Sequence, residues 1–362
     1  MFSRNRFLAV LVTAISAVWL IGSSAADAQK TTPNPVAKAP APTVTPTPSP
    51  TPEDEVIKVD TDVVNVLFTA QDRNRRLLTD LKQADIRLLE DGKAQEMITF
   101  SRQVDLPLSL AILIDTSGSQ ERTLPEEKAA AISFLETVMR PAKDEVCVVS
   151  FTGEATLEQG MTNNLNRLRR AVDQVKFVPP SGYIGGGVIA GTPPISGNQT
   201  AGSTAIWDAV WITSEEILGP APEKTRRAII LVTDGQNNFG KKKLDDAVQA
   251  ALRSEAIIYS VGIGDNFYFG VDKATLNKVS ERTGGRAYFP RDERELRDAF
   301  QQIQEEMRSQ YLIAYEPTNQ VRDGAYRKIE IELTNQQLVK DKVKVTHRQG
   351  YFAKSASKKI NR

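Results

Sequence analysis

The sequence of 362 residues contains one cysteine, Cys147, and one histidine, His347. A single cysteine excludes an intrachain disulfide, and the apolar neighbours of Cys147 predict a buried structural thiol. A histidine-based catalytic triad needs a base beside a nucleophile, and zinc sites are built mainly from histidine and cysteine. Because the chain has only one residue of each type, we expect neither kind of centre.

The chain also lacks an excess of charge of either sign, because 46 Lys and Arg residues face 45 Asp and Glu residues. If residues 1–28 are removed, Arg4, Arg6 and Asp27 go with them, and 44 residues of each sign remain. Binding to nucleic acid or to an anionic membrane depends on clustered positive charge. The balance therefore predicts no nucleic-acid partner.

Long hydrophobic runs are missing except near the N-terminus. Arg4 and Arg6 precede an apolar run of about 16 residues, Phe7–Gly22, and Ala26-Asp27-Ala28 follows it. This order is typical of a secretory signal peptide over residues 1–28, and the run is shorter than the roughly 20 residues that span a bilayer. No cysteine directly follows the run, which excludes a bacterial lipid anchor. We expect an exported protein, secreted or in the periplasm or cell envelope, with no transmembrane span after cleavage. An uncleaved membrane anchor is the alternative.

Two polar segments are not expected to bury a core. Residues 29–54 are rich in Pro, Thr and Ala, a composition that predicts either an extended, semi-rigid spacer or a plain disordered tail. Residues 355–362 form a short basic tail.

Apolar strands alternate with amphipathic helices between residues 105 and 308. This alternation is typical of βαβ units, and it predicts an α/β fold with a doubly wound, mostly parallel sheet and helices on both faces. The predicted strands are 108–114, 146–151, 228–232 and 256–261, and the predicted helices are 125–139, 165–175, 204–218, 244–253, 273–282 and 293–309.

The segments on either side of this region, 55–104 and 309–354, have strand patterns. In the first, an Asp91-Gly92 turn predicts a hairpin between residues 86–90 and 94–100. Neither segment alone has enough strands to form a good core. We therefore predict that the two segments pair with each other into a small β-sandwich, with the α/β region inserted between them. The predicted strands are 63–69, 86–90, 94–100, 311–315, 326–333 and 343–347.

Oxygen-bearing side chains follow the ends of two predicted strands. Asp115, Ser117 and Ser119 come directly after strand 108–114, Asp234 follows strand 228–232, and Thr204 begins a helix. Open α/β folds bind ligands at the carboxyl edge of the sheet, where such strands end. Oxygen ligands suit a hard divalent cation such as Mg²⁺. Taken singly, these residues could instead cap helices or form turns. Taken together, they predict a metal site.

These five residues give the chain its resemblance to the von Willebrand factor type A family. The family's metal-ion-dependent adhesion site has the pattern Asp-x-Ser-x-Ser, then Thr, then Asp, which Asp115, Ser117, Ser119, Thr204 and Asp234 match in order. The wider layout, with Leu89–Lys93, Arg322–Ile329 and the Gly350–Phe352 ending, also resembles a poorly defined bacterial group of exported proteins with a related domain.

The resemblance implies one ion, Mg²⁺ or Mn²⁺, held by the serines and the threonine, with the aspartates acting mostly through water. Such an ion keeps an open position for an Asp or Glu carboxylate of a partner protein. Arg122 and Thr123 stand where some relatives have paired acids for a second ion, so we expect a single metal. The predicted function is a non-enzymatic, adhesion-type binding module. The alternatives are an envelope scaffold with a stabilising metal and a metal-dependent hydrolase, for which the sequence offers no clear general base.

Three further features lie near this site in the sequence. Residues 178–203 form a long Gly/Pro/Ser-rich insertion before Thr204, which we interpret as a specificity loop, a flexible lid or a disordered segment. Lys241-Lys242-Lys243 predicts a solvated helix start, and the spacing of Trp207 and Trp211 predicts core positions on one helix.

Overall fold

The structure is a computed structural model that describes residues 62–103, 105–179, 183–184, 187–188, 203–222, 225–264 and 270–355. The predicted signal peptide, the spacer, most of the 178–203 insertion and all but the first residue of the basic tail lie outside these residues. Within the described part, no helix is both long and apolar enough to cross a membrane.

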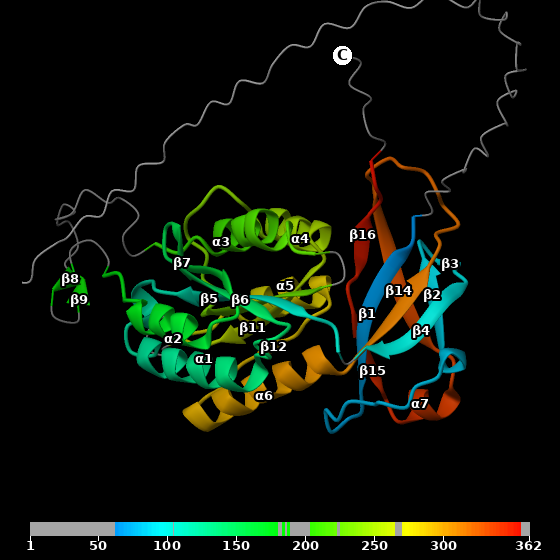
Figure 1. The fold of residues 1–362 in the computed structure, drawn as a ribbon, viewed down its shortest axis with the longest axis horizontal. Coiled ribbons are helices and arrows are strands. Elements are labelled where there is room, and N and C mark those ends of the chain that lie inside the picture. The colour runs from blue at the N-terminus through cyan, green and yellow to red at the C-terminus, as the bar shows by residue number, and fades with distance from the viewer. Residues whose placement is uncertain are drawn as a thin grey trace, which may run out of the picture. The chain divides into compact units, whose positions relative to one another are not determined.

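A six-stranded sheet forms the centre of the α/β region (Figure 1). Its order is β12-β11-β10-β5-β6-β7, and every neighbouring pair is parallel except β6 and β7. The central strand β5 is buried at all eight positions, as expected for a strand covered on both faces. The strands are β5 (Leu108–Asp115), β6 (Glu145–Phe151), β7 (Ala155–Thr162), β10 (Arg226–Thr233), β11 (Ala256–Gly262) and β12 (Ala287–Tyr288).

Helices cover both faces of this sheet, which confirms the predicted doubly wound fold. Because side chains alternate along a strand, Ile112 of β5 packs in the core beneath one helix layer, whereas Leu113 packs beneath the other. The first layer contains α1 (Leu124–Val138), α2 (Leu165–Gln174) and α6 (Glu293–Arg308), and the second contains α3 (Ile206–Ile212), α4 (Leu244–Arg253) and α5 (Lys273–Thr283). Cys147 is fully buried in the second core, and burial raises the pKa of its thiol to about 12.

Two features of this region differ from the prediction. The expected helix 204–218 begins at Ile206 and passes into a π-helical segment, η3 (Thr213–Leu218). Neither edge strand of the sheet was predicted, because the side chains of β7 are exposed or only partly buried and give no buried apolar run, and β12 has only two residues.

The flanking segments form two four-stranded antiparallel sheets, ordered β15-β1-β13-β4 and β16-β14-β2-β3. Each sheet takes strands from both ends of the chain, so the predicted pairing is confirmed. The sheets share one core, in which Phe68 stacks on Tyr311 with 5.1 Å between ring centroids. The strands are β1 (Val64–Gln71), β2 (Ile86–Glu90), β3 (Lys93–Ala94), β4 (Met97–Gln103), β13 (Gln310–Tyr315), β14 (Tyr326–Leu333), β15 (Lys344–His347) and β16 (Gly350–Phe352). The shorter elements are η1 (Gln83–Asp85) and α7 (Gln336–Lys340).

The predicted hairpin between residues 86–90 and 94–100 is wrong beyond its turn. Only the two residues of β3 pair with β2, and residues from Met97 onward form β4 beside β13 in the other sheet. There Phe100 stacks on Tyr311, with 5.5 Å between ring centroids. Burial of this aromatic ring in the shared core outweighs continuation of the hairpin.

A buried polar cluster joins the sandwich to the α/β region. Glu306 of α6 is 2% exposed, and its Oε1 accepts hydrogen bonds from Gln71 Nε2 of β1 (2.8 Å) and the Tyr288 hydroxyl of β12 (2.9 Å). Arg286 forms an ion pair with the same oxygen at 3.3 Å and also donates to Gln71 Oε1. One carboxylate therefore connects three elements from distant parts of the chain.

We expect Glu306→Ala to destabilise the fold by about 2–4 kcal/mol, because it leaves Arg286, Tyr288 and Gln71 buried without their acceptor. The measurement is the free energy of unfolding in urea. Glu293→Ala, which removes an exposed ion pair from the same helix, is the matched control and should cost about 0.5 kcal/mol or less. Equal losses in the two variants would contradict the role of the cluster.

Candidate metal centre

Asp115 is the last residue of β5, and its side chain is completely buried. Its Oδ1 accepts a hydrogen bond from the backbone N–H of Ser117 at 2.9 Å. Its Oδ2 accepts one from the hydroxyl of Thr233, the last residue of the neighbouring strand β10, at 2.6 Å. Both oxygens are thus held in place at the carboxyl edge of the sheet, where the prediction puts the site.

Ser117 and Ser119 lie in the turn between β5 and α1. Their hydroxyl oxygens are 3.3 Å apart. Ser117 precedes the short 3-10 helix η2 (Gly118–Gln120), but its side chain makes no capping hydrogen bond to it. The alternative interpretation of Ser117 as a helix cap is therefore wrong, and its hydroxyl faces the neighbouring serine instead.

Asp234 follows β10 and is 4% exposed. Its Oδ1 accepts a hydrogen bond from the backbone N–H of Gln236 at 2.9 Å, and the nearby hydroxyl of Ser119 favours the charged form of its carboxylate and so lowers its pKa. Gly235 then turns the chain at φ +85°, a conformation that side chains rarely adopt. The turn directs Asp234 toward the β5–α1 turn, so that the two predicted loops meet.

Thr204 lies one residue before the N-cap of α3, so it does not cap that helix. Its backbone N–H donates to Asn238 Oδ1 at 2.7 Å, and its carbonyl accepts from the N–H groups of Asn238 and Phe239 at 3.1 Å each. These bonds join Thr204 to the loop that follows Asp234. The structure thus brings Asp115, Ser117, Ser119 and Asp234 close to one another, and it bonds the backbone of Thr204 to the loop that follows Asp234.

The electrostatics of this cluster favour a cation. The pKa of Asp115 is raised to about 7, mainly by burial and in smaller part by the charge of Asp234, while hydrogen bonds from Ser117 and Thr233 oppose the rise. Burial also raises the pKa of Asp234. Two buried carboxylates close together destabilise each other's charge, and a divalent cation would remove that penalty.

The donor set fits a hard ion. Among the described residues, no group of three or more His, Cys, Asp or Glu side chains could hold a metal. A metal at this edge would therefore depend on the hydroxyls of Ser117, Ser119 and Thr204 as much as on the two aspartates. Such an all-oxygen set suits Mg²⁺ or Mn²⁺ better than the softer metals.

Glu127 is a further buried acid near this cluster that the sequence analysis did not identify. It lies on α1, is 1% exposed, and neither carboxylate oxygen makes a hydrogen bond within normal geometry. Burial raises its pKa to about 8, and the charges of Asp115 and Asp234 contribute to the shift. At neutral pH this side chain is therefore mostly uncharged. Its spacing from the buried Leu124 and Ala130 could have revealed its inward position.

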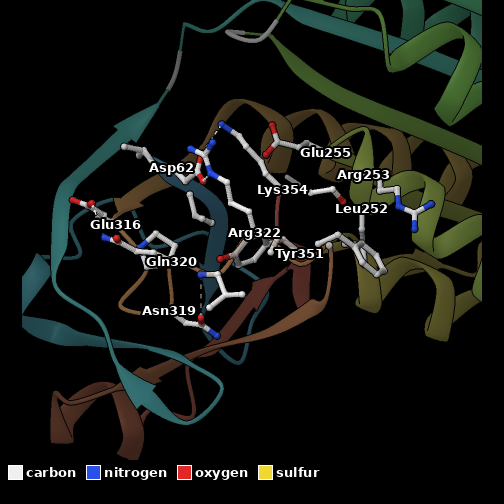
Figure 2. A pocket seen from close by; sticks show the side chains of 18 of the residues that line it. Asp62, Leu252, Arg253, Glu255, Glu316, Asn319, Gln320, Arg322, Tyr351 and Lys354 are labelled. Carbon is white, nitrogen blue, oxygen red and sulfur yellow. Dashed lines mark hydrogen bonds and ion pairs between the residues drawn. The ribbon is translucent and has the colours of Figure 1, made fainter. Parts of the chain in front are cut away.

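A cavity of about 590 Å³ lies away from the metal-type cluster, between the sandwich and the C-terminal end of α4 (Figure 2). Its charged side chains mostly pair with one another. Asp62 pairs with Arg322 at 2.7 Å and with Lys354 at 2.9 Å, while Arg348 pairs with Glu255 at 3.4 Å. Because these pairs satisfy the charges around the cavity, the candidate functional site remains the edge of the α/β sheet.

Fold and site together define a doubly wound α/β domain with an oxygen-lined, metal-type cluster at the carboxyl edge of its sheet. Two family models, both described as von Willebrand factor type A domain, match residues 110–236 and 195–302. Residues 110–302 of the chain are therefore similar to this domain family, and the matched residues contain all five predicted site residues.

Solved structures with related folds come from animals and bacteria. Proximal thread matrix protein 1 from the mussel byssus is 18% identical over 60% of this chain and 51% of its own, with a TM-score of 0.45. Another structure of that protein, with a zinc-occupied metal site, is 19% identical over 60% of this chain and 49% of its own, with a TM-score of 0.43. The conserved hypothetical protein BatB from Bacteroides thetaiotaomicron is 16% identical over 56% of this chain and all of its own, with a TM-score of 0.41. This chain spans about half the length of the mussel protein. No curated protein matches the sequence.

We expect the affinity for Mg²⁺ to rise with pH and to level off above about pH 7, because protons compete with the metal for Asp115. Below that pH, each unit of acidification should weaken binding by up to about tenfold for each proton displaced. Calorimetric titration of the metal-free protein from pH 5.5 to 8.5 measures this profile.

Two variants test the origin of the profile. Asp115→Asn should bind weakly and with little pH dependence. Glu127→Gln replaces a mostly uncharged acid by a neutral amide of the same shape, so it should keep the wild-type slope below pH 7. A wild-type affinity that does not change over the whole range would show that Asp115 is not a ligand.

Proposed function

We propose that this chain is an exported, non-enzymatic binding module that uses one Mg²⁺ or Mn²⁺ ion to recognise a partner protein. Asp115, Ser117, Ser119, Thr204 and Asp234 hold the ion, which bridges to an Asp or Glu carboxylate of the partner. The single observation that carries the proposal is the closeness of Asp115, Ser117, Ser119 and Asp234 in a region similar to the von Willebrand factor type A domain, which is often a metal-dependent protein-binding module.

The ligand count supports an open position. A divalent ion of this kind takes about six oxygen ligands, some of which are water. The predicted set offers five side chains, and if the aspartates act through water, the charge of the ion is only partly neutralised. An anionic oxygen from another protein is the natural ligand for the remaining position, since it supplies the sixth oxygen and also the negative charge that neutralises the ion.

The surroundings of the cluster favour binding over hydrolysis. A metal-dependent hydrolase needs a general base that is ionised and accessible to water. His347 lies in β15 of the sandwich, and Glu127 is buried with a pKa of about 8. Among the described residues, neither group therefore offers a base to a water molecule on the ion.

Metal dependence tests the proposal directly. The chain without residues 1–28 is immobilised and used to capture proteins from an envelope fraction of its own organism. The captured proteins are identified, purified and then tested for direct binding. We expect the partner to bind in Mg²⁺, to be released by EDTA and to bind again when Mg²⁺ returns. Asp115→Ala and Ser119→Ala should abolish binding, whereas Asp298→Ala, on the exposed side of α6, should not.

Three outcomes would contradict this function. Equal binding in EDTA and to Asp115→Ala would exclude a metal bridge. A fall in melting temperature on metal removal, without release of any partner, would favour a structural metal in a scaffold. Turnover of an ester or phosphoester that is lost in Asp234→Ala would favour a hydrolase.

Export is tested separately. We expect the protein to fractionate outside the cytoplasm and its mature N-terminus to follow Ala28, because residues 1–28 have the charged, apolar and small-residue order of a signal peptide. N-terminal sequencing of the fractionated protein measures this. An intact N-terminus in the membrane fraction would favour the uncleaved anchor instead.

A further inference from the structure

The loop between β10 and α4 follows directly from Asp234 and is fixed to α3 along its length. Asn237 Oδ1 accepts from the Trp207 backbone N–H at 3.3 Å, and the Phe239 N–H donates to the Thr204 carbonyl at 3.1 Å. The next residue, Gly240, has a φ of +102°, and a side chain there would collide with Asp208 of α3. The surface of this loop is therefore preorganised rather than free to rearrange.

Phe239 is 44% exposed on this fixed loop, although its backbone is bound to the candidate ligand Thr204. A large apolar side chain gains nothing from water, and a loop held this firmly could have folded with a polar residue at that position. The exposure thus places an apolar contact point next to the candidate ligand Thr204, on the loop that follows Asp234.

Two lysines continue the same surface. The carboxylate of Asp208 accepts hydrogen bonds from the backbone N–H groups of Lys241 and Lys242, at 3.1 Å each, rather than from their ammonium groups. The Lys242 ammonium lies 3.8 Å from the ring centre of Trp211, which is half-buried on α3 rather than fully in the core as predicted. Lys241 is exposed and forms no ion pair within the described part of the chain.

We propose that Phe239, Lys241, Lys242 and Trp211, called here the α3 strip, bind an acidic segment of the partner protein that carries an apolar residue. The inference rests on the proposed function: the partner's first carboxylate reaches the ion, its apolar side chain contacts Phe239, and a second carboxylate pairs with Lys241 or Lys242. Positive charge on the ion and on the strip complements such a segment.

The length of the strip sets the spacing of that segment. Trp211 lies five positions after Ile206, the first residue of α3, a rise of about 7.5 Å at about 1.5 Å per helical residue, and Thr204 lies two residues before the helix. An extended chain covers this distance in about three residues, at about 3.3 Å each. The two acids of the partner are therefore about three positions apart, with the apolar residue between them.

Defined peptides test the strip without knowledge of the natural partner. The probe is immobilised Gly-Ser-Asp-Leu-Gly-Glu-Gly-Ser, compared with peptides in which Asp becomes Asn, Leu becomes Ser, or Glu becomes Gln. In Mg²⁺ we expect the wild-type chain to bind the parent peptide about threefold to tenfold more tightly than the peptide with Ser in place of Leu. We expect the same difference from the peptide with Gln in place of Glu, since each change removes a single contact at the edge of an interface.

The protein variants assign each preference to a residue. Phe239→Ala should lose the preference for Leu, and the double variant Lys241→Gln with Lys242→Gln should lose the preference for Glu. Both should keep Mg²⁺-dependent binding of the Asp peptide. Val339→Ala with Lys340→Gln, an exposed pair on α7 in the sandwich, is the matched control and should keep both preferences.

The outcomes separate the strip from the metal bridge. If the wild-type chain shows no preference for Leu or Glu, or if the strip variants keep both preferences, the strip is not the binding surface. This conclusion holds whether or not binding depends on the metal. If the strip variants change the preferences but EDTA and Asp115→Ala leave binding intact, the metal bridge fails while the strip stands. A preference for phosphorylated serine over Glu would replace the acidic segment by a phosphopeptide and overturn the proposal.

Discussion

The burial of the Asp115 carboxylate at the centre of the sheet edge is the constraint around which the functional part of the structure is arranged. An ionised group without solvent is costly, and hydrogen bonds from Ser117 and Thr233 offset only part of that cost, since the pKa of Asp115 still rises to about 7. The uncharged Glu127 and the nearby Asp234 supply no positive charge. A divalent cation is the group that the surroundings of Asp115 are suited to receive, and this is the basis on which we propose a metal site at the sheet edge.

The loop that starts at the carboxyl edge of the α/β sheet offers the proposed partner a binding surface in addition to the ion. Asp234 begins the loop that binds Thr204 through Asn238 and then continues along α3 to Lys242. One short stretch of chain thus carries an acid of the metal cluster, the support of a candidate ligand, and an exposed apolar and basic surface. Because hydrogen bonds to its backbone and side chains fix the loop, the proposed binding of a partner would cost little loop entropy.

The sandwich depends on a different constraint, the need to bring both ends of the folded chain together. Neither flank has enough strands for a core, so β1 must pair with β13 and β2 with β14 across the inserted α/β region. Glu306 then joins the finished sandwich to α6 and β12 through Gln71, Arg286 and Tyr288. The two regions are therefore joined by buried contacts within one compact unit.

Local patterns in the sequence were enough to predict the alternation of strands and helices, the pairing of the flanks and the meeting of Asp115 with Asp234. These follow from hydrophobic periodicity and from the rule that parallel strands end at one edge. Tertiary packing alone decided the rest. Phe100 leaves its hairpin because the Tyr311 ring lies in the other sheet, and Phe239 is exposed because Thr204 holds its backbone. Each of these outcomes depends on a contact between residues far apart in the chain, which short-range periodicity does not encode.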